Sequence, residues 1–353
     1  MKRFLPVLFV VSVLFVLSVP SSADVFNLGP GLTSLETVTV GDPGNAGELS
    51  GAGAGGYGPD RVCGAVSYAY SIGKYEITAA QYTDFLNKVA ATDTYGLYHN
   101  WMWSDSEGCK IQRSGSSGSY TYSIAADWAN RPVNYVSFWD SCRFANWLHN
   151  GQPTGLQNLS TTEDGAYYLN GYTDYTGGDV QAFQRKASWK WAVTSEDEWY
   201  KAAYYKGGGG TNAGYWDYPM QGELPAVPDN NVANPDDGNN ANFFDGDYSI
   251  GSPYFRTVAG EFENSESPYG TFDQGGNVWE WNEGVMYPYS YPRIRGGSFS
   301  ASISYLFAQN RYMYGEEGES CGFRVVQAVP EPSSLMILAG GIGMLLGIRR
   351  RNG

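Results

Sequence analysis

The sequence predicts an α+β domain with little regular secondary structure and long loops. Glycine and tyrosine are frequent, with 46 and 28 residues in a chain of 353, whereas only 16% of residues are charged. This composition favours short strands, many turns and long ordered loops over a helical bundle. With 42% hydrophobic residues, the chain is long enough to form one sizeable core.

The first predicted elements are a strand and an amphipathic helix. Residues 65–72, with the sequence AVSYAYSI, form a strand-like run. Thr78 and Gln81 then form a capping-box pattern, in which each side chain can satisfy a backbone amide at a helix start. Apolar side chains behind this pattern recur at helical spacing, which predicts a helix over about 79–90.

Two further helix starts and a long loop follow. One helix is predicted to begin at Ser137, and another follows the capping box of Ser195 and Glu198. Residues 206–270 are rich in Gly, Asn, Asp and Pro and are predicted to be mostly loop, after which short strands alternate with turns. No internal linker is evident, so one domain over 60–328 is predicted.

The N-terminal segment is predicted to lie outside this domain. Lys2 and Arg3 precede an apolar run and then Ser21-Ser22-Ala23, a pattern typical of a secretory signal peptide, which is predicted over 1–23. An uncleaved membrane anchor is the alternative. Residues 24–59, which contain GAGAGGYG, are interpreted as a loose Gly-rich leader.

The C-terminal residues 329–353 contain three features in order: Pro330-Glu331-Pro332, an apolar stretch over 335–348, and three arginines at 349–351. This end resembles a PEP-CTERM sorting signal, which implies export from a Gram-negative cell with an exosortase as partner. The apolar stretch predicts a short transmembrane helix, below the roughly 20 residues of a comfortable span, with the arginines on the cytoplasmic side. The protein is then expected to be membrane-anchored before sorting and afterwards to reach the outer surface or the extracellular space. A plain tail anchor is the alternative.

The charge of the chain limits its partners. The formal net charge is −14, and removal of the basic residues at both ends would make the body more acidic still. Binding of a phosphate backbone needs clustered Lys and Arg, so nucleic-acid binding is not expected. The acidic body suits solubility outside the cell and the binding of cations.

Cysteine and histidine are scarce. An even number of cysteines in an exported protein makes disulfides possible, and three pairings of Cys63, Cys109, Cys142 and Cys321 are open. The chain has no CxxC motif, no Cys/His cluster and only 2 histidines, so a His-based metal or catalytic site is not expected.

Six segments, in chain order, resemble the sulfatase-modifying-factor family, the group of the formylglycine-generating enzyme. They are GKYEITAAQYTDFLN (73–87), RPVNYVSFWDSCRFANWL (131–148), WAVTSEDEWYKAAYY (191–205), YGTFDQGGNVWEWNE (269–283), RIRGGSF (293–299) and CGFRVV (321–326). The resemblance spans nearly the whole body. It implies a C-type-lectin-like α+β domain, in agreement with the composition.

The resemblance also implies an activity that this sequence does not support. The family oxidises a sulfatase cysteine to formylglycine with oxygen and copper(I), which two cysteines bind just after the GGS turn. Those positions are Ala301 and Leu306 here, and neither supplies the thiolate that a soft ion needs. Copper is therefore not expected, although Ser298 of the turn and Arg311 downstream are retained.

Structural calcium is a further implication of the resemblance. Asp273 and Glu280 match family ligand positions, with the carbonyls of Gly276 and Val278 between them, and calcium prefers such oxygen ligands. The alternative is that FDQGGNVWEW is simply a turn into a core strand.

A second calcium site and one disulfide are also implied by the family. The second site would use Asn242 and the carbonyl of Phe243, but its other ligands fall where this sequence departs from the family. The family often bridges the second helix to the last strand region, which suggests a Cys142–Cys321 disulfide and leaves the other two cysteines as a second pair.

The predicted function is that of an exported, non-catalytic binding or structural component of the cell envelope or exopolysaccharide matrix. Aromatic faces suit sugars, although the same side chains could instead belong to the core. Six tyrosines crowd the C-terminal part of the body: Tyr287, Tyr289, Tyr291, Tyr305, Tyr312 and Tyr314.

Three alternatives stay open at this point. The first is a formylglycine-generating oxidase. The second is a partner of an iron-dependent sulfur-inserting enzyme, which needs a His cluster that this chain lacks. The third is a diversified ligand binder, with variable positions between the GGS turn and GFR. Glu196, Asp197 and Glu198 could serve acid–base chemistry, but acidic side chains also favour a helix N-terminus, which is the preferred interpretation.

Overall fold

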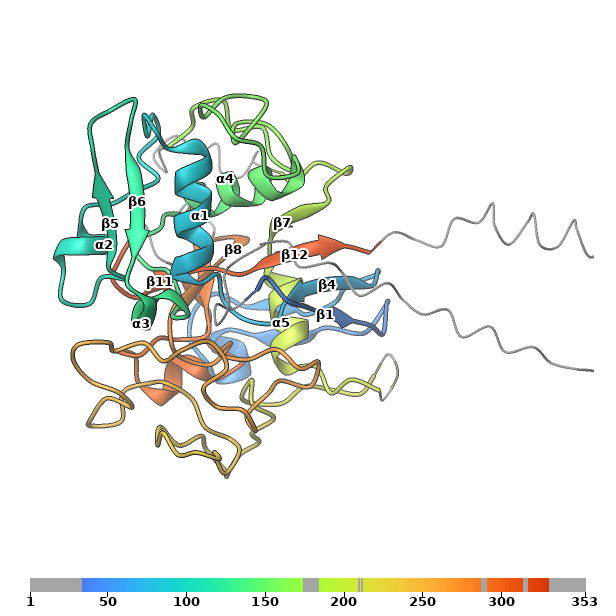
Figure 1. Cartoon of the computed structure of the whole chain (residues 1–353). Coiled ribbons are helices and arrows are strands. Elements are labelled where there is room, and N and C mark those ends of the chain that lie inside the picture. Colours follow the sequence, from blue (N-terminus) through green and yellow to red (C-terminus); the bar gives the residue numbers. More distant parts are fainter. Residues whose placement is uncertain are drawn as a thin grey trace, which may run out of the picture.

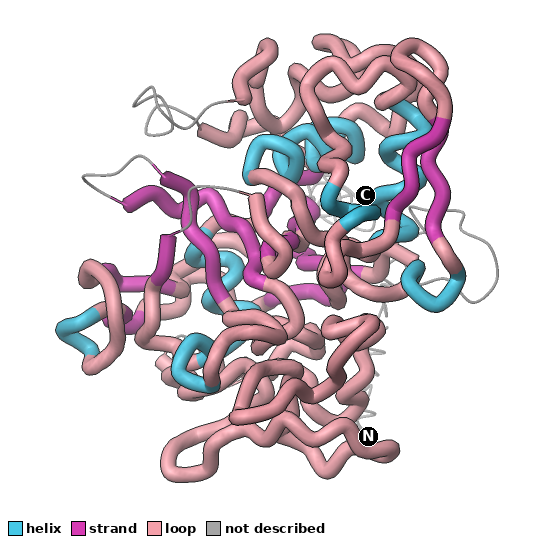
Figure 2. Tube along the Cα trace, turned by 90° about the vertical axis from the view of Figure 1, so that its left-hand side faces the viewer, coloured by secondary structure: helices cyan, strands magenta, loops and turns pink. Residues whose placement is uncertain are grey.

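The computed structural model describes residues 34–173, 184–208, 210, 212–286, 291–313 and 317–329. Figures 1 and 2 show a mixed α+β body in which short helices and strands are joined by long loops. The predicted signal peptide over 1–23 and the predicted transmembrane helix near the C-terminus lie outside the described residues. Within the described part of the chain, no helix is long and apolar enough to cross a membrane.

The main sheet joins the two ends of the domain. Its strand order is β1 (Thr37–Val40), β4 (Tyr70–Gly73), β12 (Val325–Ala328) and β7 (Trp191–Val193), and every neighbouring pair is antiparallel. Figure 1 shows β12 beside β4, so the last strand of the domain is inserted between early ones. Side chains such as Tyr70, Ile72 and Val326, all 0% exposed, form the core face of this sheet.

The second sheet carries the C-terminal part of the body. Its order is β10 (Tyr312–Met313), β9 (Tyr291–Arg295), β8 (Trp279–Met286) and β11 (Cys321–Gly322). β8 and β9 are antiparallel, with an irregularity between Asn282 and Val285, whereas β11 runs parallel to β8. Two small hairpins, β2 (Glu48–Ser50) with β3 (Arg61–Cys63) and β5 (Ile111–Ser114) with β6 (Thr121–Ile124), complete the strands.

The three predicted helix starts are confirmed. α1 (Ala79–Val89), α4 (Phe138–His149) and α5 (Glu196–Tyr204) each begin with a capping box, set by Thr78, Ser137 and Ser195 respectively. These boxes satisfy backbone amides that the first helical turn leaves without partners. Short helical turns occur at α2 (Trp101–Ser104), α3 (Ala126–Ala129), η1 (Ala52–Ala54) and η3 (Ile303–Leu306).

An aromatic core holds α1 and α4 together. Phe85 and Phe144 meet edge to face with ring centroids 5.2 Å apart, and Trp147 lies 5.2 Å from Phe85. Phe323, beside the last strand, contacts Phe144 at 5.3 Å. Edge-to-face pairs at these separations contribute about 0.5–1.5 kcal/mol beyond the burial of their area.

The predicted strand over 65–72 is shorter in the structure, where β4 covers Tyr70–Gly73. The reason lies in the loop contacts of Val66, whose carbonyl accepts from the Gly44 amide at 2.8 Å and whose amide donates to the side chain of Asn45. The predicted long loop over 206–270 is confirmed, since only isolated bridges occur among the residues described there.

Residues 34–59, predicted as part of a loose leader, belong to the folded domain. β1 lies in the main sheet, and Leu35 and Val40 are buried in the core. The glycines of 51–58 let this segment pack closely against the backbone of residues 309–311. A Cβ on Gly56, for example, would collide with the Gln309 carbonyl. The segment therefore packs against residues 309–311. The folded domain begins before the predicted boundary at 60.

Candidate functional site

The GGS turn is a tightly packed loop between β9 and η3. Gly296 and Gly297 adopt left-handed φ angles of 97° and 80°, which side chains rarely tolerate. A Cβ on Gly296 would also lie 2.5 Å from the Gln274 carbonyl. Ser298 follows, fully buried, with its carbonyl accepting from the Ala301 amide at 3.0 Å and its hydroxyl 3.3 Å from that of Ser300.

The two positions where the family places copper ligands carry apolar, buried side chains. Ala301 is 9% exposed and belongs to the main core. Leu306 is fully buried and packs in a separate cluster with Tyr218, Met220 and Phe243. Neither position offers a donor atom to a metal, and both side chains instead contribute to apolar packing.

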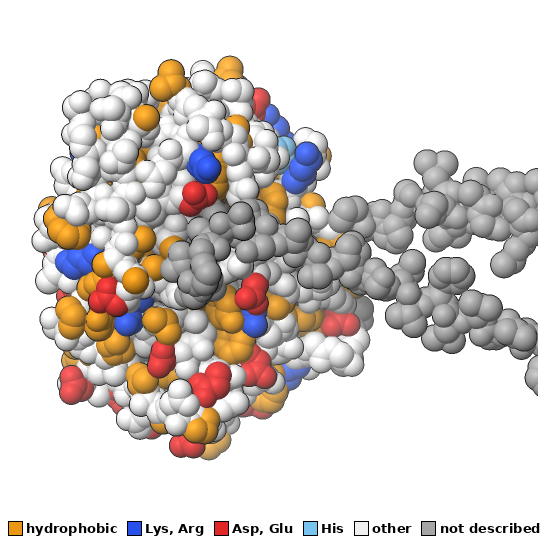
Figure 3. Space-filling view, in the orientation of Figure 1, with side chains coloured by type: hydrophobic (Ala, Val, Ile, Leu, Met, Phe, Trp, Pro, Cys, Tyr) orange, Lys and Arg blue, Asp and Glu red, His pale blue; other side chains and the backbone are white. Residues whose placement is uncertain are grey.

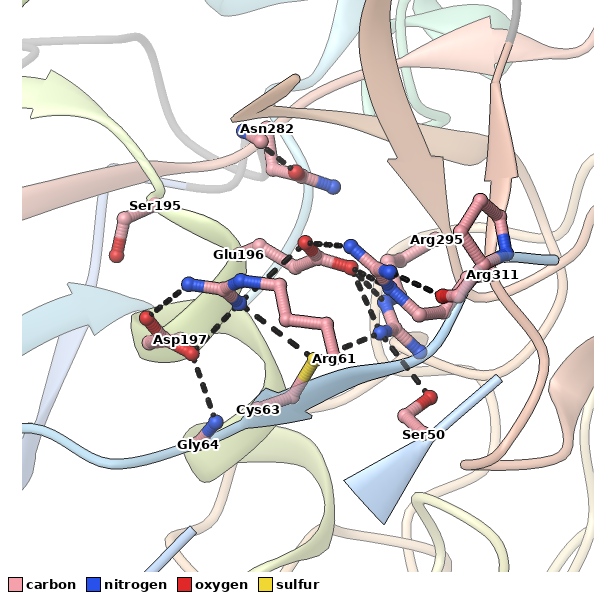
Figure 4. A network of polar contacts seen from close by, with 12 residues as sticks. Ser50, Arg61, Cys63, Gly64, Ser195, Glu196, Asp197, Asn282, Arg295 and Arg311 are labelled. Carbon is pink, nitrogen blue, oxygen red and sulfur yellow. Dashed lines mark hydrogen bonds and ion pairs between the residues drawn. The ribbon is translucent and has the colours of Figure 1, made fainter. Parts of the chain in front are cut away.

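Arg311, predicted as a retained pocket residue, turns away from this loop towards α5. Its guanidinium pairs with the carboxylate of Glu196, with Nη2 2.7 Å from Oε2 and Nε 2.8 Å from Oε1. Arg295 donates to the same carboxylate from Nη2 at 2.8 Å (Figure 4). All three side chains are at most 2% exposed. Burial alone would raise the pKa of Glu196, but the two arginines hold it well below its usual range.

Arg61 extends this network to the surface. It donates to Asp197 at 2.8 and 2.5 Å, and Asp197 also accepts from the Gly64 amide (Figure 4). The Cys63 thiol lies among these groups, 3.3 Å from Nη2 of Arg295. Burial and the nearby Glu196 raise the pKa of this thiol. Sequence analysis preferred a helix-start role for Glu196 and Asp197 over acid–base chemistry, whereas the two carboxylates bind arginines from three distant segments.

A second buried network surrounds Glu280. Arg324 donates to both carboxylate oxygens at 2.6 Å, and the Trp199 indole donates to Oε2 at 2.7 Å. Glu76, which sequence analysis missed, lies nearby and accepts from Asn277 and from the Val278 amide. Burial raises the pKa of Glu76 well above its usual range, and the charges of neighbouring carboxylates raise it further.

An aromatic stack lies beside the GGS loop. Tyr57 and Tyr312 are stacked with ring centroids 4.9 Å apart, and Tyr312 lies 4.6 Å from Tyr305 of η3. Trp279 lies at the buried end of the stack. Its ring centroid is 5.4 Å from that of Tyr305 and 5.5 Å from that of Tyr312. Tyr57 is 59% exposed, whereas Trp279 is 9% exposed, so the stack runs from solvent into the core.

These four residues include only part of the predicted tyrosine group. Tyr305 and Tyr312 lie in the stack, and Tyr291 lies in β9, where its side chain is not described. Tyr287, Tyr289 and Tyr314 lie outside the described residues. Tyr57, from the segment interpreted as a leader, was missed because nothing local links it to residues 305–312.

Comparison with known protein families shows to which family the folded domain belongs. The model of the sulfatase-modifying factor enzyme 1-like domain matches residues 56–329. The chain belongs to this family. A model of the PEP-CTERM protein-sorting motif matches residues 328–351. This sulfatase-modifying-factor protein therefore carries a signal for export and sorting to the cell surface. No curated protein matches the chain.

Solved structures resemble this sulfatase-modifying-factor protein at low sequence identity. CarF is 18% identical, covering 84% of this chain and 99% of its own, with a TM-score of 0.43. PvdO from Pseudomonas aeruginosa is 18% identical, covering 84% and 95%, with a TM-score of 0.45. Treponema denticola variable protein 1 is 16% identical, covering 85% and 97%, with a TM-score of 0.47. The family match and the observed few helices, short strands and long loops confirm the predicted fold class.

The side chains of the first calcium site that the family resemblance implies make other contacts in the structure, and the site stays a prediction. Both oxygens of Glu280 accept hydrogen bonds, from Arg324 and from Trp199, so a cation bound here would lie beside a buried guanidinium. Asp273 accepts from the Gly260 amide at 2.7 Å, and burial raises the pKa of its carboxyl to about 6. Gly276 packs with its backbone against Asn242, where a Cβ would collide. No metal-binding group of three His, Cys, Asp or Glu occurs among the described residues.

Asn242 and Phe243 form the second predicted site, and Asn242 bridges to Gly276, whose amide donates to the Gly296 carbonyl of the GGS loop. The Asn242 side chain donates to the Phe255 carbonyl and to Asn277, whereas its amide oxygen is buried without a donor among the described residues. The Phe243 carbonyl accepts from Asn230 at 3.2 Å and from the Ser249 hydroxyl at 3.3 Å. An unused buried acceptor is a suitable cation ligand.

The predicted Cys142–Cys321 disulfide is absent from the structure. All four cysteines are described as buried free thiols. Cys142 lies in the middle of α4 and Cys321 in β11, and each belongs to the apolar core. Burial raises the pKa of both thiols, as expected for side chains that act as small apolar core residues.

Proposed function

We propose that this exported sulfatase-modifying-factor protein is a non-catalytic glycan-binding component of the cell envelope or exopolysaccharide matrix. The observation that carries the proposal is the pairing of two features at one loop. Ala301 and Leu306 leave the former metal positions without donor atoms, and the aromatic stack of Tyr57, Tyr305 and Tyr312 lies beside them. The loop therefore offers an aromatic surface and no metal-ligand atom at these two side chains.

The physics of the stack favours a sugar ligand. Tyrosine combines a large apolar face with a polar hydroxyl, and few rotatable bonds must be ordered on binding. Tyr57 is exposed, and Tyr312 supports its ring from behind, so the exposed face is held in place before a ligand arrives. A sugar ring could stack on this face while its hydroxyls stay hydrated.

The location of the protein supports this class of ligand. The PEP-CTERM motif directs the chain to the cell surface through exosortase recognition. We propose that the short C-terminal helix anchors the protein in the membrane before sorting, and that the body is afterwards displayed outside the cell. Acidic side chains are spread over the lower half of the face in Figure 3, where the long loops lie, in keeping with a solvated exterior.

The aromatic stack gives the first prediction. Tyr57→Ala should weaken binding of the producing cell's own polysaccharide by about tenfold, because an aromatic contact contributes about 0.5–1.5 kcal/mol and the support of the stack is lost with it. The measurement is biolayer interferometry with the purified protein. Tyr168→Ala is the matched control, since Tyr168 is 56% exposed and has no ring contact among the described residues.

Two results would count against this proposal. Equal loss in the Tyr57 and Tyr168 variants would show that the stack has no special role. Absence of any polysaccharide binding by the wild-type protein at millimolar sugar concentration would remove the proposed ligand class.

We also propose that this protein binds calcium at Asn242 and Phe243. Support comes from the buried Asn242 amide oxygen, which lacks a donor among the described residues, whereas both oxygens of Glu280 accept from Arg324 or Trp199. Calcium takes amide, backbone carbonyl and carboxylate oxygens as ligands.

A further inference from the structure

Two tryptophans of the short helix α2 are exposed to solvent. Trp101 is 56% exposed and Trp103 is 46% exposed, whereas Met102 between them is fully buried. Figure 1 shows α2 at the outer edge of the body, beside β5. Single exposed apolar side chains are common on protein surfaces, so exposure alone does not indicate a binding site. The surroundings of Trp101 distinguish it from Trp103.

Trp101 forms a corner with two other rings. His99 is stacked on Tyr135, with ring centroids 5.5 Å apart and an interplanar angle of 13°. The Trp101 ring is steeply inclined to both, at 65° to His99 and 67° to Tyr135, with centroid distances of 4.9 and 5.8 Å. Trp103 makes no ring contact within the part of the chain that the structure describes. We call His99, Trp101 and Tyr135 the aromatic corner.

Hydrogen bonds position the aromatic corner. The Trp101 amide donates to Nδ1 of His99 at 3.2 Å, so the proton of the neutral imidazole lies on Nε2, which is 3.4 Å from Oε1 of Glu317. Burial lowers the pKa of His99, so the imidazole is neutral at pH 7. Burial and the charge of Asp140 raise the pKa of Glu317 to about 8, so this carboxyl is mostly neutral as well. The corner itself therefore carries no positive charge that would repel a cation.

Three further carboxylates gather beside the corner. Burial raises the pKa of Tyr135, and the charges of Asp105, Glu319 and Glu107 raise it further. Burial also raises the pKa of Glu107, to which the charges of Glu319 and Asp105 add. No ion pair joins any of these three carboxylates to a Lys or Arg of the described residues. Their negative charges therefore repel one another at the surface.

Asn134 holds two of these acidic residues together. Its side chain is fully buried, and Nδ2 donates to the backbone carbonyls of both Glu107 and Glu319. Its Oδ1 atom accepts from no donor of the described residues. One unused buried acceptor thus lies at the junction where the two acidic residues meet.

Two positive charges lie near this junction without neutralising it. The Lys110 ammonium donates to the backbone carbonyl of Asp105 and lies 5.6 Å from the ring centroid of Trp128. Arg256 is fully buried and donates to the backbone carbonyl of Glu107. Even when both cations are set against the three carboxylates, one negative charge remains in excess.

We propose that the aromatic corner and the neighbouring carboxylates bind an organic ammonium group. The indole face attracts cations more strongly than any other aromatic side chain, and the ligand's charge compensates the unpaired carboxylates. The formal net charge of −14 also favours the approach of a cation. A neutral ligand would use the rings but not the carboxylates. This site does not involve Tyr57 and does not depend on the proposed glycan-binding function.

Binding of defined amines to the purified full chain tests the proposal. Isothermal titration calorimetry at pH 7 uses choline and glucosamine as probes. The neutral controls are the carbon isostere of choline, in which a tert-butyl group replaces the trimethylammonium, and N-acetylglucosamine. At least one of the two amines is expected to bind at millimolar concentration, and more weakly at high salt, whereas its neutral control is not. Binding of choline alone identifies a quaternary ammonium as the ligand, and binding of glucosamine identifies an amino sugar.

Trp101→Ala should weaken binding of the amine about 5- to 30-fold, because a cation–π contact with a tryptophan is lost. Trp101→Phe should restore part of this loss, since phenylalanine keeps an aromatic face. The matched control is Trp103→Ala, which removes an exposed tryptophan from the same helix but leaves the aromatic corner intact. This control should bind the amine like the wild-type protein.

The double variant Glu107→Gln/Glu319→Gln keeps all three rings, so it provides a second test if Trp101→Ala fails to fold. It should weaken binding of the amine about 3- to 10-fold and remove most of its salt dependence. Three results would overturn the proposal: no binding of either amine by the wild-type chain, equal binding of the neutral controls, or equal affinities in the Trp101→Ala and Trp103→Ala variants.

Discussion

Glu196→Gln is expected to lower the free energy of unfolding by about 3–5 kcal/mol, because breaking a buried ion pair leaves uncompensated charge behind. The carboxylate is the shared partner of Arg295 and Arg311, both almost fully buried, and no other carboxylate of the described residues pairs with either. A loss of this size is a large fraction of the roughly 5–15 kcal/mol that stabilises an ordinary domain.

Urea unfolding followed by tryptophan fluorescence measures this loss. Glu223→Gln is the matched control, since Glu223 pairs with Lys206 at the surface with its side chain 54% exposed, and such pairs contribute at most about 1 kcal/mol. A change below about 1 kcal/mol for Glu196→Gln would contradict the assigned role.

The ion pairs of Glu196 with Arg295 and Arg311 stabilise the fold in a pH-dependent way, because the pKa of Glu196 is lowered. A carboxyl with a folded-state pKa below its unfolded value of about 4.3 contributes fully above that value and loses its contribution only as the pH falls through the folded-state pKa. Hence the difference in stability between wild type and Glu196→Gln should persist from pH 7 down to about pH 5.

Glu280→Gln should be destabilising by a similar amount, about 3–5 kcal/mol, for a related reason. Arg324 and Glu280 are both 0% exposed, and the substitution leaves the guanidinium charged and unpaired in the core. Replacing both residues by methionine should restore part of the loss, since apolar side chains of similar volume can substitute for a buried pair.

Calcium distinguishes this ion-pair role from a ligand role for Glu280. If the pair acts as described, the loss in Glu280→Gln is the same in EDTA and in calcium. Any rise in the unfolding midpoint on calcium addition should disappear in Asn242→Ala and persist in Glu280→Gln. The account of Glu280 is wrong if its destabilisation appears only when calcium is present.

Local signals in the sequence predicted the helices well. The capping boxes of Thr78, Ser137 and Ser195 depend on residues three positions apart, so the sequence alone contains the whole interaction. The long loop over 206–270 was likewise predictable from its composition. The family resemblance added the GGS loop and the two positions, Ala301 and Leu306, at which thiolates are missing.

Long-range contacts were the part that the sequence did not reveal. Glu196 meets Arg311 across 115 residues, and Glu76 meets Asn277 across 201. The glycines of 51–58 suggested flexibility, whereas they allow tight packing against residue 309. One signal was available in RIR at 293–295, because two arginines at alternate positions of a strand lie on one face and need a common anionic neighbour.

Copper binding and aldehyde formation test the central claim most directly. The purified exported body is incubated with cuprous ion, oxygen and a cysteine-containing sulfatase peptide, and both bound copper and peptide aldehyde are quantified by mass spectrometry. Since Ala301 and Leu306 have no sulfur and the four thiols lie buried elsewhere, the account predicts no tightly bound copper at this loop and an unchanged peptide. One tightly held cuprous ion together with conversion of the cysteine to formylglycine would contradict it.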